Sequence, residues 1–470
     1  MLVVSLPSIA KSEVEYTLDI VCKERLGLEY SIKYHSEPVV LIEMLGRSEK
    51  LTFSTSFFER YDLEGLSLKL LPSQGVLLLE SGQIPTRIYS SFECKLSGPL
   101  PVLYGDPCIE QSKAEIKISI DIFGIIFFML SRCEELILSE RDLHDRFPAS
   151  ASLAYKEGFL ERPIVDEYVE LLWACMKSQW PELKRKVQQP QTYISCDVDT
   201  PFDSTVRSLP LLAKTCIADV VKRRSFPEAL RRVRRYINNK KEDYRYDPNY
   251  TFDWYMDVCE RAGLKTAFYF IPTSLESNNG DYKLTDRGIE NLLIKIHSRG
   301  HEIGVHGSYQ TYLDSSKILK QKNILENTLQ RIGINQKIRG NRQHYLRWNA
   351  EITPELLDEA GFEYDSSGGY ADYAGFRYGT AYEFSMWGWG SRKKLALKQR
   401  PLIVMENTLI EKCYMGLGKG DACIDYVRGL VVASRNYNGN FALLWHNSSL
   451  RTCLDKELFL KCISIAGASS

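Results

Sequence analysis

The chain has 470 residues, which is too long for one ordinary hydrophobic core and predicts two domains. Sixty Lys and Arg residues balance sixty Asp and Glu residues, so the formal net charge is zero. A chain without net charge has no global field that attracts nucleic acid or an anionic membrane, and no nucleic-acid partner is expected. Any partner must be recognised by a local group of residues.

No secretory or transmembrane segment is expected. Residues 1–11 lack a basic start followed by a long apolar run, and the most apolar run, 122–130, is far too short to cross a bilayer. The twelve cysteines are scattered without a C-x-x-C pair, so neither a disulfide framework nor a thiolate zinc finger is indicated. These features predict a cytoplasmic protein with reduced thiols.

The first half of the chain, residues 1–185, predicts a smaller, mixed α/β accessory domain. An alternating segment at 66–70 and an apolar run at 76–79 are typical of strands, and an apolar helix is expected at 123–130. The polar residues 188–191 then interrupt the pattern, which indicates a linker or the first turn of a second domain over 186–470.

The second half alternates between short apolar strands and amphipathic helices. Strands are expected at 193–195, 266–271, 302–305 and 441–444, and helices at 254–262, 289–298 and 315–332. This alternation predicts a parallel α/β barrel or a doubly wound sheet. In both folds, ligands bind at the carboxyl ends of the strands.

Charged and imidazole side chains follow several of these strands. Asp197, Asp199 and His306 each come at or just past the end of a strand, and His446 closes another. Five of the seven histidines lie within 297–446. The pattern predicts that these side chains converge in a metal-centred hydrolytic site, although Asp is also common after strands because it caps the backbone of turns.

The two carboxylates of the segment Asp197-Val198-Asp199 can have different roles at one site. Side chains alternate along an extended chain, so both carboxylates point to the same side. One can bind a divalent cation while the other takes a proton from water that the cation has made more acidic. His301 and His306 are five residues apart, which sends them to opposite faces of a regular strand, and His306 is the better ligand candidate.

A basic stretch lies on an expected pair of helices. It comprises Lys222, Arg223, Arg224, Arg231, Arg232, Arg234 and Arg235. A solvated helix face is the favoured interpretation, and a docking surface for anionic glycan or lipid headgroups is the alternative.

Residues 190–450 resemble the polysaccharide deacetylase family, also called carbohydrate esterase family four. The resemblance rests on motifs in the family's order: Asp197-Val198-Asp199, then Gly300 to Gln310, Arg342-Gln343-His344-Tyr345, Asp365-Ser366-Ser367 and Leu444-Trp445-His446. The strand Thr266-Ala267-Phe268-Tyr269-Phe270 matches the one that usually follows the first motif. Each motif is unspecific alone, whereas the ordered set is specific.

The resemblance implies a distorted (β/α)7-type barrel and the hydrolysis of an N-acetyl or related acyl group on a sugar. It implies that Asp197 is the general base, that Asp199 and His306 are metal ligands, and that His446 is the acid for the leaving amine. Further roles are also implied: Arg342 would orient Asp197, Asp365 would orient His446, the backbone N–H of Tyr345 would stabilise the oxyanion, and Leu444 and Trp445 would line the acyl pocket.

Two positions depart from the family pattern. Gln310 stands where the second metal-binding histidine is usual, so a complete triad requires the Gln310 carbonyl oxygen or another ligand. The third motif has His344 in place of proline, and this imidazole is the other candidate for the missing ligand. Zinc is the expected divalent metal, with cobalt or manganese as alternatives, because a site poor in nitrogen favours a harder ion.

The N-terminal half resembles an uncharacterised domain that accompanies a bacterial subgroup of these deacetylases. The resemblance is carried by residues 127–135, 142–147 and 162–166. It implies a role in capsule or other surface-polysaccharide biosynthesis. Arg132 with Glu134 and Glu135 is interpreted as a buried or interfacial salt bridge rather than as a second active site.

The leading hypothesis is a metal-dependent carbohydrate N-deacetylase whose partner is an N-acylated sugar or glycan. The alternative is a catalytically impaired carbohydrate-binding or assembly protein on the same fold, a hypothesis motivated by Gln310. The sequence indicates neither the sugar nor the oligomeric state.

Overall fold

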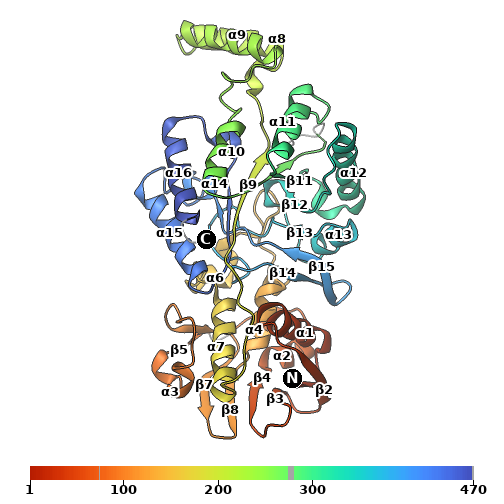
Figure 1. The fold of residues 1–470 in the computed structure, drawn as a ribbon, viewed down its shortest axis with the longest axis vertical. Coiled ribbons are helices and arrows are strands. Elements are labelled where there is room, and N and C mark those ends of the chain that lie inside the picture. Colours follow the sequence, from red (N-terminus) through yellow and green to blue (C-terminus); the bar gives the residue numbers. More distant parts are fainter. Residues whose placement is uncertain (73–74, 274–279, 468–470) are drawn as a thin grey trace.

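The computed structural model describes residues 1–72, 75–273 and 280–467. Three parts follow one another along the longest axis of the molecule (Figure 1): an N-terminal sheet with its helices, a larger sheet flanked by helices, and a projecting pair of helices, α8 (Leu209–Val221) and α9 (Phe226–Lys240). Among the described residues, no helix combines the length and apolar character needed to cross a membrane.

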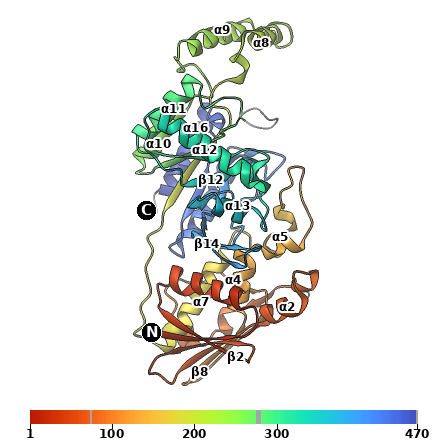
Figure 2. The same ribbon diagram turned by 90° about the vertical axis from the view of Figure 1, so that its right-hand side faces the viewer.

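The N-terminal part is built on a six-stranded sheet in the order β2-β1-β3-β4-β8-β7. Its strands are β1 (Leu2–Pro7), β2 (Tyr30–His35), β3 (Val39–Met44), β4 (Lys50–Ser54), β7 (Gly105–Gln111) and β8 (Glu115–Ile120), and a separate pair consists of β5 (Leu77–Leu79) and β6 (Leu100–Val102). The helices are α1 (Lys11–Leu18), α2 (Ser56–Glu64), α3 (Thr86–Tyr89), α4 (Ile122–Leu130), α5 (Cys133–Ile137), α6 (Leu153–Lys156) and α7 (Ile164–Gln179). Helices α1, α4 and α7 lie on the side of the sheet that faces the rest of the chain (Figure 2).

Two expected elements of this half are confirmed and one is wrong. The apolar run 76–79 contains β5, and the apolar helix 123–130 is α4, whose residues are all buried. Asp121 caps α4 by accepting a hydrogen bond from the Gly124 N–H at 2.7 Å. The alternating segment 66–70 is not a strand, because Leu68–Leu70 form a short 3-10 helix that buries only Leu70.

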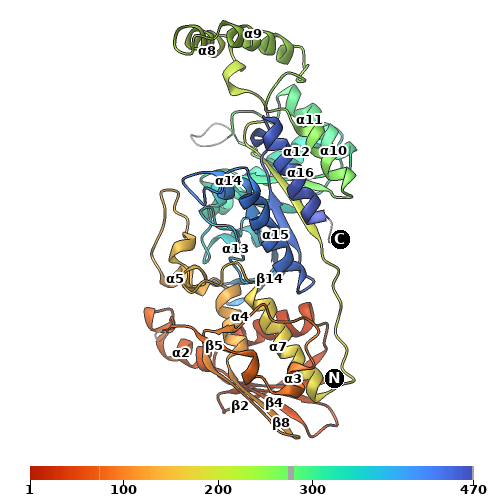
Figure 3. The ribbon, with the colours of Figure 1, turned by 90° about the vertical axis from the view of Figure 1, so that its left-hand side faces the viewer.

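Residues 183–191 form neither helix nor strand and run from the end of α7 to the larger sheet (Figure 3). This segment includes the polar residues 188–191. Its first part still contacts the N-terminal half, since the Lys186 N–H donates a hydrogen bond to the Leu26 carbonyl oxygen at 2.8 Å. The domain boundary at 185/186 therefore falls in an extended connection, and the division into two domains stays a prediction.

The larger sheet has nine strands in the order β14-β15-β13-β12-β11-β10-β9-β17-β16. Every neighbouring pair is parallel except β14 with β15. The strands are β9 (Thr192–Val198), β10 (Thr266–Phe270), β11 (Glu302–Gly307), β12 (Gly340–Gln343), β13 (Tyr364–Asp365), β14 (Phe384–Gly388), β15 (Lys393–Gln399), β16 (Val404–Met405) and β17 (Phe441–Leu444). The predicted mixed α/β class is confirmed. No pair between the edge strands β14 and β16 closes a barrel among the described residues.

Helices follow most of these strands and pack around the sheet (Figures 1 and 3). They are α10 (Phe252–Arg261), α11 (Arg287–Ser298), α12 (Ser315–Arg331), α13 (Thr353–Glu359), α14 (Glu406–Ile410), α15 (Asp421–Arg435) and α16 (Cys453–Gly467). The helices expected at 254–262, 289–298 and 315–332 correspond to α10, α11 and α12, and the four expected strands correspond to β9, β10, β11 and β17.

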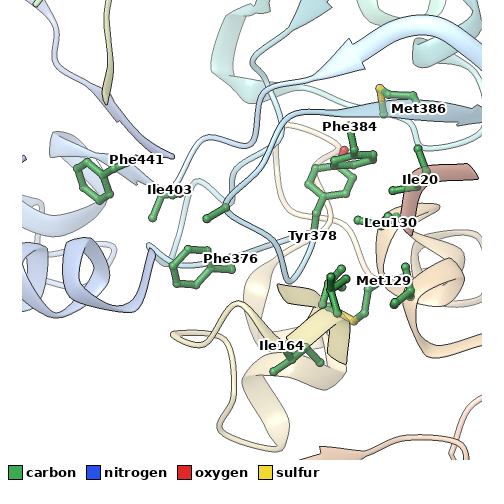
Figure 4. Close-up of a cluster of buried hydrophobic side chains, with 14 of the residues drawn as sticks. Ile20, Met129, Leu130, Ile164, Phe376, Tyr378, Phe384, Met386, Ile403 and Phe441 are labelled. Atoms are coloured by element: carbon green, nitrogen blue, oxygen red, sulfur yellow. The ribbon is translucent and has the colours of Figure 1, made fainter. Parts of the chain in front are cut away.

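One hydrophobic core joins the two halves of the chain. Figure 4 shows Met129, Leu130 and Ile164 of the N-terminal half close to Tyr378 and Phe384 of the C-terminal half. Continuous burial across this boundary means that the N-terminal part is packed against the larger sheet rather than tethered to it.

A buried charge network reinforces this contact. Arg132 donates to Glu135 Oε1 at 2.7 Å and to Glu134 Oε1 at 2.5 Å, and Arg377 donates to both oxygens of Glu135 at 2.9 and 2.7 Å. Arg132 also donates to the hydroxyl of Tyr370 at 2.8 Å. The interpretation of Arg132, Glu134 and Glu135 as a buried salt bridge is confirmed, and the network links the two halves.

Candidate metal centre

The carboxyl ends of four strands bring the expected ligands together. Asp197 lies in β9 with Asp199 just beyond it, His306 lies in β11, and His344 follows β12 directly. Because these strands are parallel neighbours around β10, their carboxyl ends meet at one edge of the sheet. His446, two residues after β17, completes the group, and all five side chains line one cavity of about 370 Å³.

Asp199, His306 and His344 are arranged so that they could hold a metal ion. One ligand atom from each of them lies within 4.8 Å of the other two. Asp199 Oδ1 is 3.3 Å from His306 Nε2 and 3.5 Å from His344 Nε2. This oxygen is buried and has no hydrogen-bond partner among the described residues. An unpartnered carboxylate oxygen between two imidazole nitrogens fits a cation.

A backbone carbonyl on the side away from Asp199 fixes the orientation of the His306 ring. Its Nδ1 atom lies 2.8 Å from the carbonyl oxygen of Arg342, which leaves Nε2 directed at Asp199. A backbone carbonyl on the remote nitrogen is a common way to hold a metal-binding imidazole in one tautomer.

His344, and not Gln310, lies beside this pair. The backbone leaves β12 through a turn in which Tyr345 has φ 61° and Leu346 has φ 56°, and this turn carries His344 into the cavity. Gln310 is exposed and is not among the residues that line the cavity. The chain leaves β11 at Gly307 and forms the short helix Thr311–Leu313, so the residue four positions after His306 lies outside the cluster.

The cluster also sets the charge state of Asp199. Burial raises the pKa of Asp199, but the neighbouring imidazoles of His344 and His306 outweigh burial and hold that pKa well below its usual range. A carboxylate that stays ionised in a buried site is the form that binds a cation.

Asp197 lies next to the cluster as a second, separate carboxylate. Its Oδ2 atom is 3.6 Å from His306 Nε2 and 3.9 Å from an Arg342 nitrogen, which is an ion-pair distance beyond hydrogen-bonding reach. Arg342 is fully buried and donates to the hydroxyls of Ser195 and Ser366 at 3.0 Å each. Asp197 Oδ1 is buried and has no hydrogen-bond partner in the described part of the chain.

His446 faces Asp199 from the opposite side and is held by a residue that the sequence did not suggest. His446 Nε2 lies 3.5 Å from Asp199 Oδ2, and its Nδ1 lies 2.6 Å from Glu406 Oε1. The backbone N–H of His446 donates to the same Glu406 oxygen at 3.0 Å. Burial lowers the pKa of His446, but Glu406 outweighs burial and, with Asp199 and Asp197, raises that pKa to about 10.

No hydrogen bond joins Asp365 to His446 among the described residues, and Glu406 is the carboxylate that contacts His446 Nδ1. Asp365 instead accepts hydrogen bonds from Asn341 Nδ2 at 2.8 Å, from Gln399 Nε2 at 3.0 Å and from the N–H and hydroxyl of Ser367. Burial raises its pKa to about 6. These contacts join β12, β13 and β15 beneath the cavity.

The two apolar residues expected at the acyl pocket lie behind the surface of this cavity or away from it. Leu444 and Trp445 are almost fully buried, and neither is among the residues that line the cavity. Leu444 packs behind Leu346 and Met405, which do line it, whereas Trp445 packs on Phe459 with ring centroids 5.2 Å apart. Tyr345 lines the cavity.

The N-terminal half contributes one residue to the cavity. Arg146 lines it, donates to the Tyr345 carbonyl oxygen at 2.9 Å and pairs with Asp142 at 2.6 Å. Nearby, Arg347 donates to the His144 carbonyl oxygen at 2.8 Å, which ties the same loop to the larger sheet. In the sequence, the segment 142–147 stands out only by its resemblance to the accessory domain, and no local pattern indicates that it reaches the strand ends.

Residues 2–181 match DUF7033, a family of unknown function. No curated protein matches the chain. Similar solved structures include a protein assigned as a polysaccharide deacetylase from Mycobacterium smegmatis, with 18% identity, a TM-score of 0.38, and coverage of 60% of this chain and 85% of that protein. Puue allantoinase has 14% identity and an assigned polysaccharide deacetylase from Pseudomonas aeruginosa PAO1 has 16%. For each of these two structures the TM-score is 0.32. The match covers 46% of this chain and 65% of the other protein.

Proposed function

We propose that the chain is a metal-dependent hydrolase that removes an N-acetyl or related acyl group from a sugar. The observation that carries the proposal is that Asp199, His306 and His344 could hold a metal ion while Asp197 and His446 line the same cavity. A base, an acid and an electrophile at one point are the groups that amide hydrolysis requires.

The position of each residue in the cavity suggests its role in the reaction. A divalent cation held by Asp199, His306 and His344 would supply, when bound, a Lewis acid for the acyl oxygen and for water. Asp197 would accept the proton of the attacking water. His446 would donate a proton to the departing amine nitrogen, and the contact of its Nδ1 with Glu406 would hold the imidazole in place.

The substrate class follows from the ordered motifs rather than from the cavity alone. We place the reaction in bacterial surface-polysaccharide metabolism in the cytoplasm, with zinc as the first metal to test and cobalt and manganese as alternatives. The closed (β/α)7-type barrel and the roles of Arg342 and of the Tyr345 N–H belong to the same proposal.

Acetate release from acetamido-sugar oligosaccharides tests the activity. The wild-type protein, loaded with zinc, cobalt or manganese, is expected to release acetate, whereas Asp197→Asn and His446→Ala are expected to lose at least about a hundredfold of the rate. His297→Ala is the matched control, because His297 lies at the end of α11 and does not line the cavity. Undiminished acetate release by either site variant would refute the role given to that residue.

The alternative of a catalytically impaired carbohydrate-binding or assembly protein rested on Gln310. His344 Nε2 lies 3.5 Å from Asp199 Oδ1 and would supply the imidazole nitrogen that Gln310 cannot offer. A purified protein with no bound divalent ion and no stimulation by added metal would favour the alternative.

A further inference from the structure

The helical hairpin α8–α9 stands away from the rest of the molecule in all three views (Figures 1, 2 and 3). It is inserted after β9, and only residues 200–208 separate it from Asp199. Two partly buried ion pairs stabilise it: Arg232 with Asp219 at 2.5 Å between the helices, and Arg235 with Asp203 at 2.5 Å at its base. The hairpin is therefore a defined element of the fold, and its outer surface has no partner in the described chain.

One face of the hairpin exposes large apolar side chains. On α9, Phe226, Leu230, Val233 and Ile237 recur at the three- and four-residue spacing of a single helix face. Phe226 is 69% exposed and Leu230 is 61% exposed, and on α8 Leu209, Ile217, Val220 and Val221 are exposed as well. An apolar groove of about 380 Å³ runs between the two helices. Solvent-facing apolar side chains in this number indicate a surface that is covered in use.

The charge of the hairpin indicates which kind of partner covers this apolar face. Residues 209–241 contain ten Lys and Arg and two Asp and Glu, a net charge of +8 in a chain whose total is zero. Eight of the ten basic residues are exposed, namely Lys214, Lys222, Arg223, Arg224, Arg231, Arg234, Lys240 and Lys241, whereas Asp219 is buried and Glu228 is partly buried. A cationic helix pair with one apolar face matches the chemistry of an anionic bilayer surface, in which apolar side chains enter the acyl boundary and basic ones meet phosphate headgroups.

We infer that the α8–α9 hairpin binds the surface of membranes rich in anionic lipid. It would lie in the headgroup region without spanning the bilayer, with Phe226, Leu230 and Ile217 inserted and the exposed basic residues among the phosphates. The hairpin adjoins the metal centre, since Asp281 lines both the catalytic cavity and a second cavity at the hairpin base. Docking would hold that cavity close to the lipid surface. The inference does not depend on the proposed activity.

Cosedimentation of the full chain with vesicles tests this inference. We expect binding to vesicles of phosphatidylcholine with phosphatidylglycerol, much weaker binding to phosphatidylcholine alone, and loss of binding in high salt, because each basic residue near an anionic surface strengthens binding by roughly fivefold. The double variant Phe226→Asp with Leu230→Asp is expected to bind at least about tenfold more weakly. The double variant Lys222→Glu with Arg224→Glu is expected to weaken binding to the anionic vesicles by roughly tenfold or more.

The controls carry the same chemical changes outside the hairpin. Leu63→Asp changes a leucine that is 82% exposed on α2, and Lys33→Glu changes an exposed lysine on β2. Both are expected to bind vesicles like the wild-type protein, and all variants should unfold at the wild-type temperature. Absence of binding to the anionic vesicles, or equal binding by the hairpin variants, would overturn the inference. A dimer that the Phe226 and Leu230 changes dissociate, without vesicle binding, would overturn it in favour of a second copy of the chain.

Discussion

The buried network around Glu135 makes the joint between the two halves sensitive to a single substitution. Arg377 is 3% exposed and holds both Glu135 oxygens, while Arg132 holds one of them. Replacing Arg377 by Met keeps an unbranched, flexible side chain and removes the guanidinium group with its charge. Removing one partner of a buried pair leaves an uncompensated charge and costs about 3–5 kcal/mol of the free energy of unfolding.

The pH dependence of this loss has a definite sign. Burial raises the pKa of Glu135, but Arg377 and Arg132 outweigh burial and lower it to about 2. Relative to an unfolded-state value of about 4.3, this shift is worth roughly 3 kcal/mol. Because the folded pKa is depressed, that stability is fully present above the unfolded pKa and is lost as the pH falls toward about 2.

Urea unfolding of the wild-type protein and of Arg377→Met, followed by circular dichroism, checks both statements. The difference in unfolding free energy is expected to be about 3–5 kcal/mol near neutral pH and to shrink as the pH falls below about 4.3. Arg47→Met is the matched control, since Arg47 and Glu182 form a pair at 2.7 Å in which both side chains are about half exposed. That change should cost about 0–1 kcal/mol. An Arg377→Met effect below about 1 kcal/mol, or one that is equal near neutral and acid pH, would refute the reasoning.

Two further substitutions test residues that the structure added to the site. Glu406→Gln removes the charge beside His446 and is expected to lower kcat for acetate release by about a hundredfold with little change in KM, while Glu406→Asp recovers part of the rate. An unchanged kcat in Glu406→Gln would remove Glu406 from the account. Arg146→Ala removes the hydrogen bond to the Tyr345 carbonyl and is expected to raise KM at least about threefold while the metal content stays at the wild-type value, as metal analysis and steady-state kinetics would show. Wild-type kinetics in this variant would show that the N-terminal half does not shape the cavity.

The residues at strand ends could be predicted from the sequence because one geometric rule places them. In a parallel sheet every carboxyl end lies at the same edge. Once the strands are located in the sequence, this rule alone predicts that Asp197, Asp199, His306 and His446 lie close together. The same rule extends to Glu406, which follows β16 directly. That strand has only two residues, and so short an apolar run does not stand out in the sequence.

Other parts of the site depend on contacts that no local pattern encodes. The left-handed backbone at Tyr345 and Leu346 turns His344 into the cavity, and neither position carries the glycine or asparagine that usually marks this conformation. Arg146 reaches the cavity only because the N-terminal half packs against the larger sheet through a shared core. The contacts of Asp365 could not be predicted either, because its partners, Asn341 and Gln399, lie on neighbouring strands far away in sequence.

Zinc binding to the metal-free protein tests the central claim most directly. Isothermal titration is expected to show about one zinc ion per chain, with affinity reduced at least about tenfold in Asp199→Ala, His306→Ala and His344→Ala and unchanged in Gln310→Ala. A wild-type protein that binds no divalent ion, or a His344→Ala variant that binds zinc as the wild type does, would contradict the account.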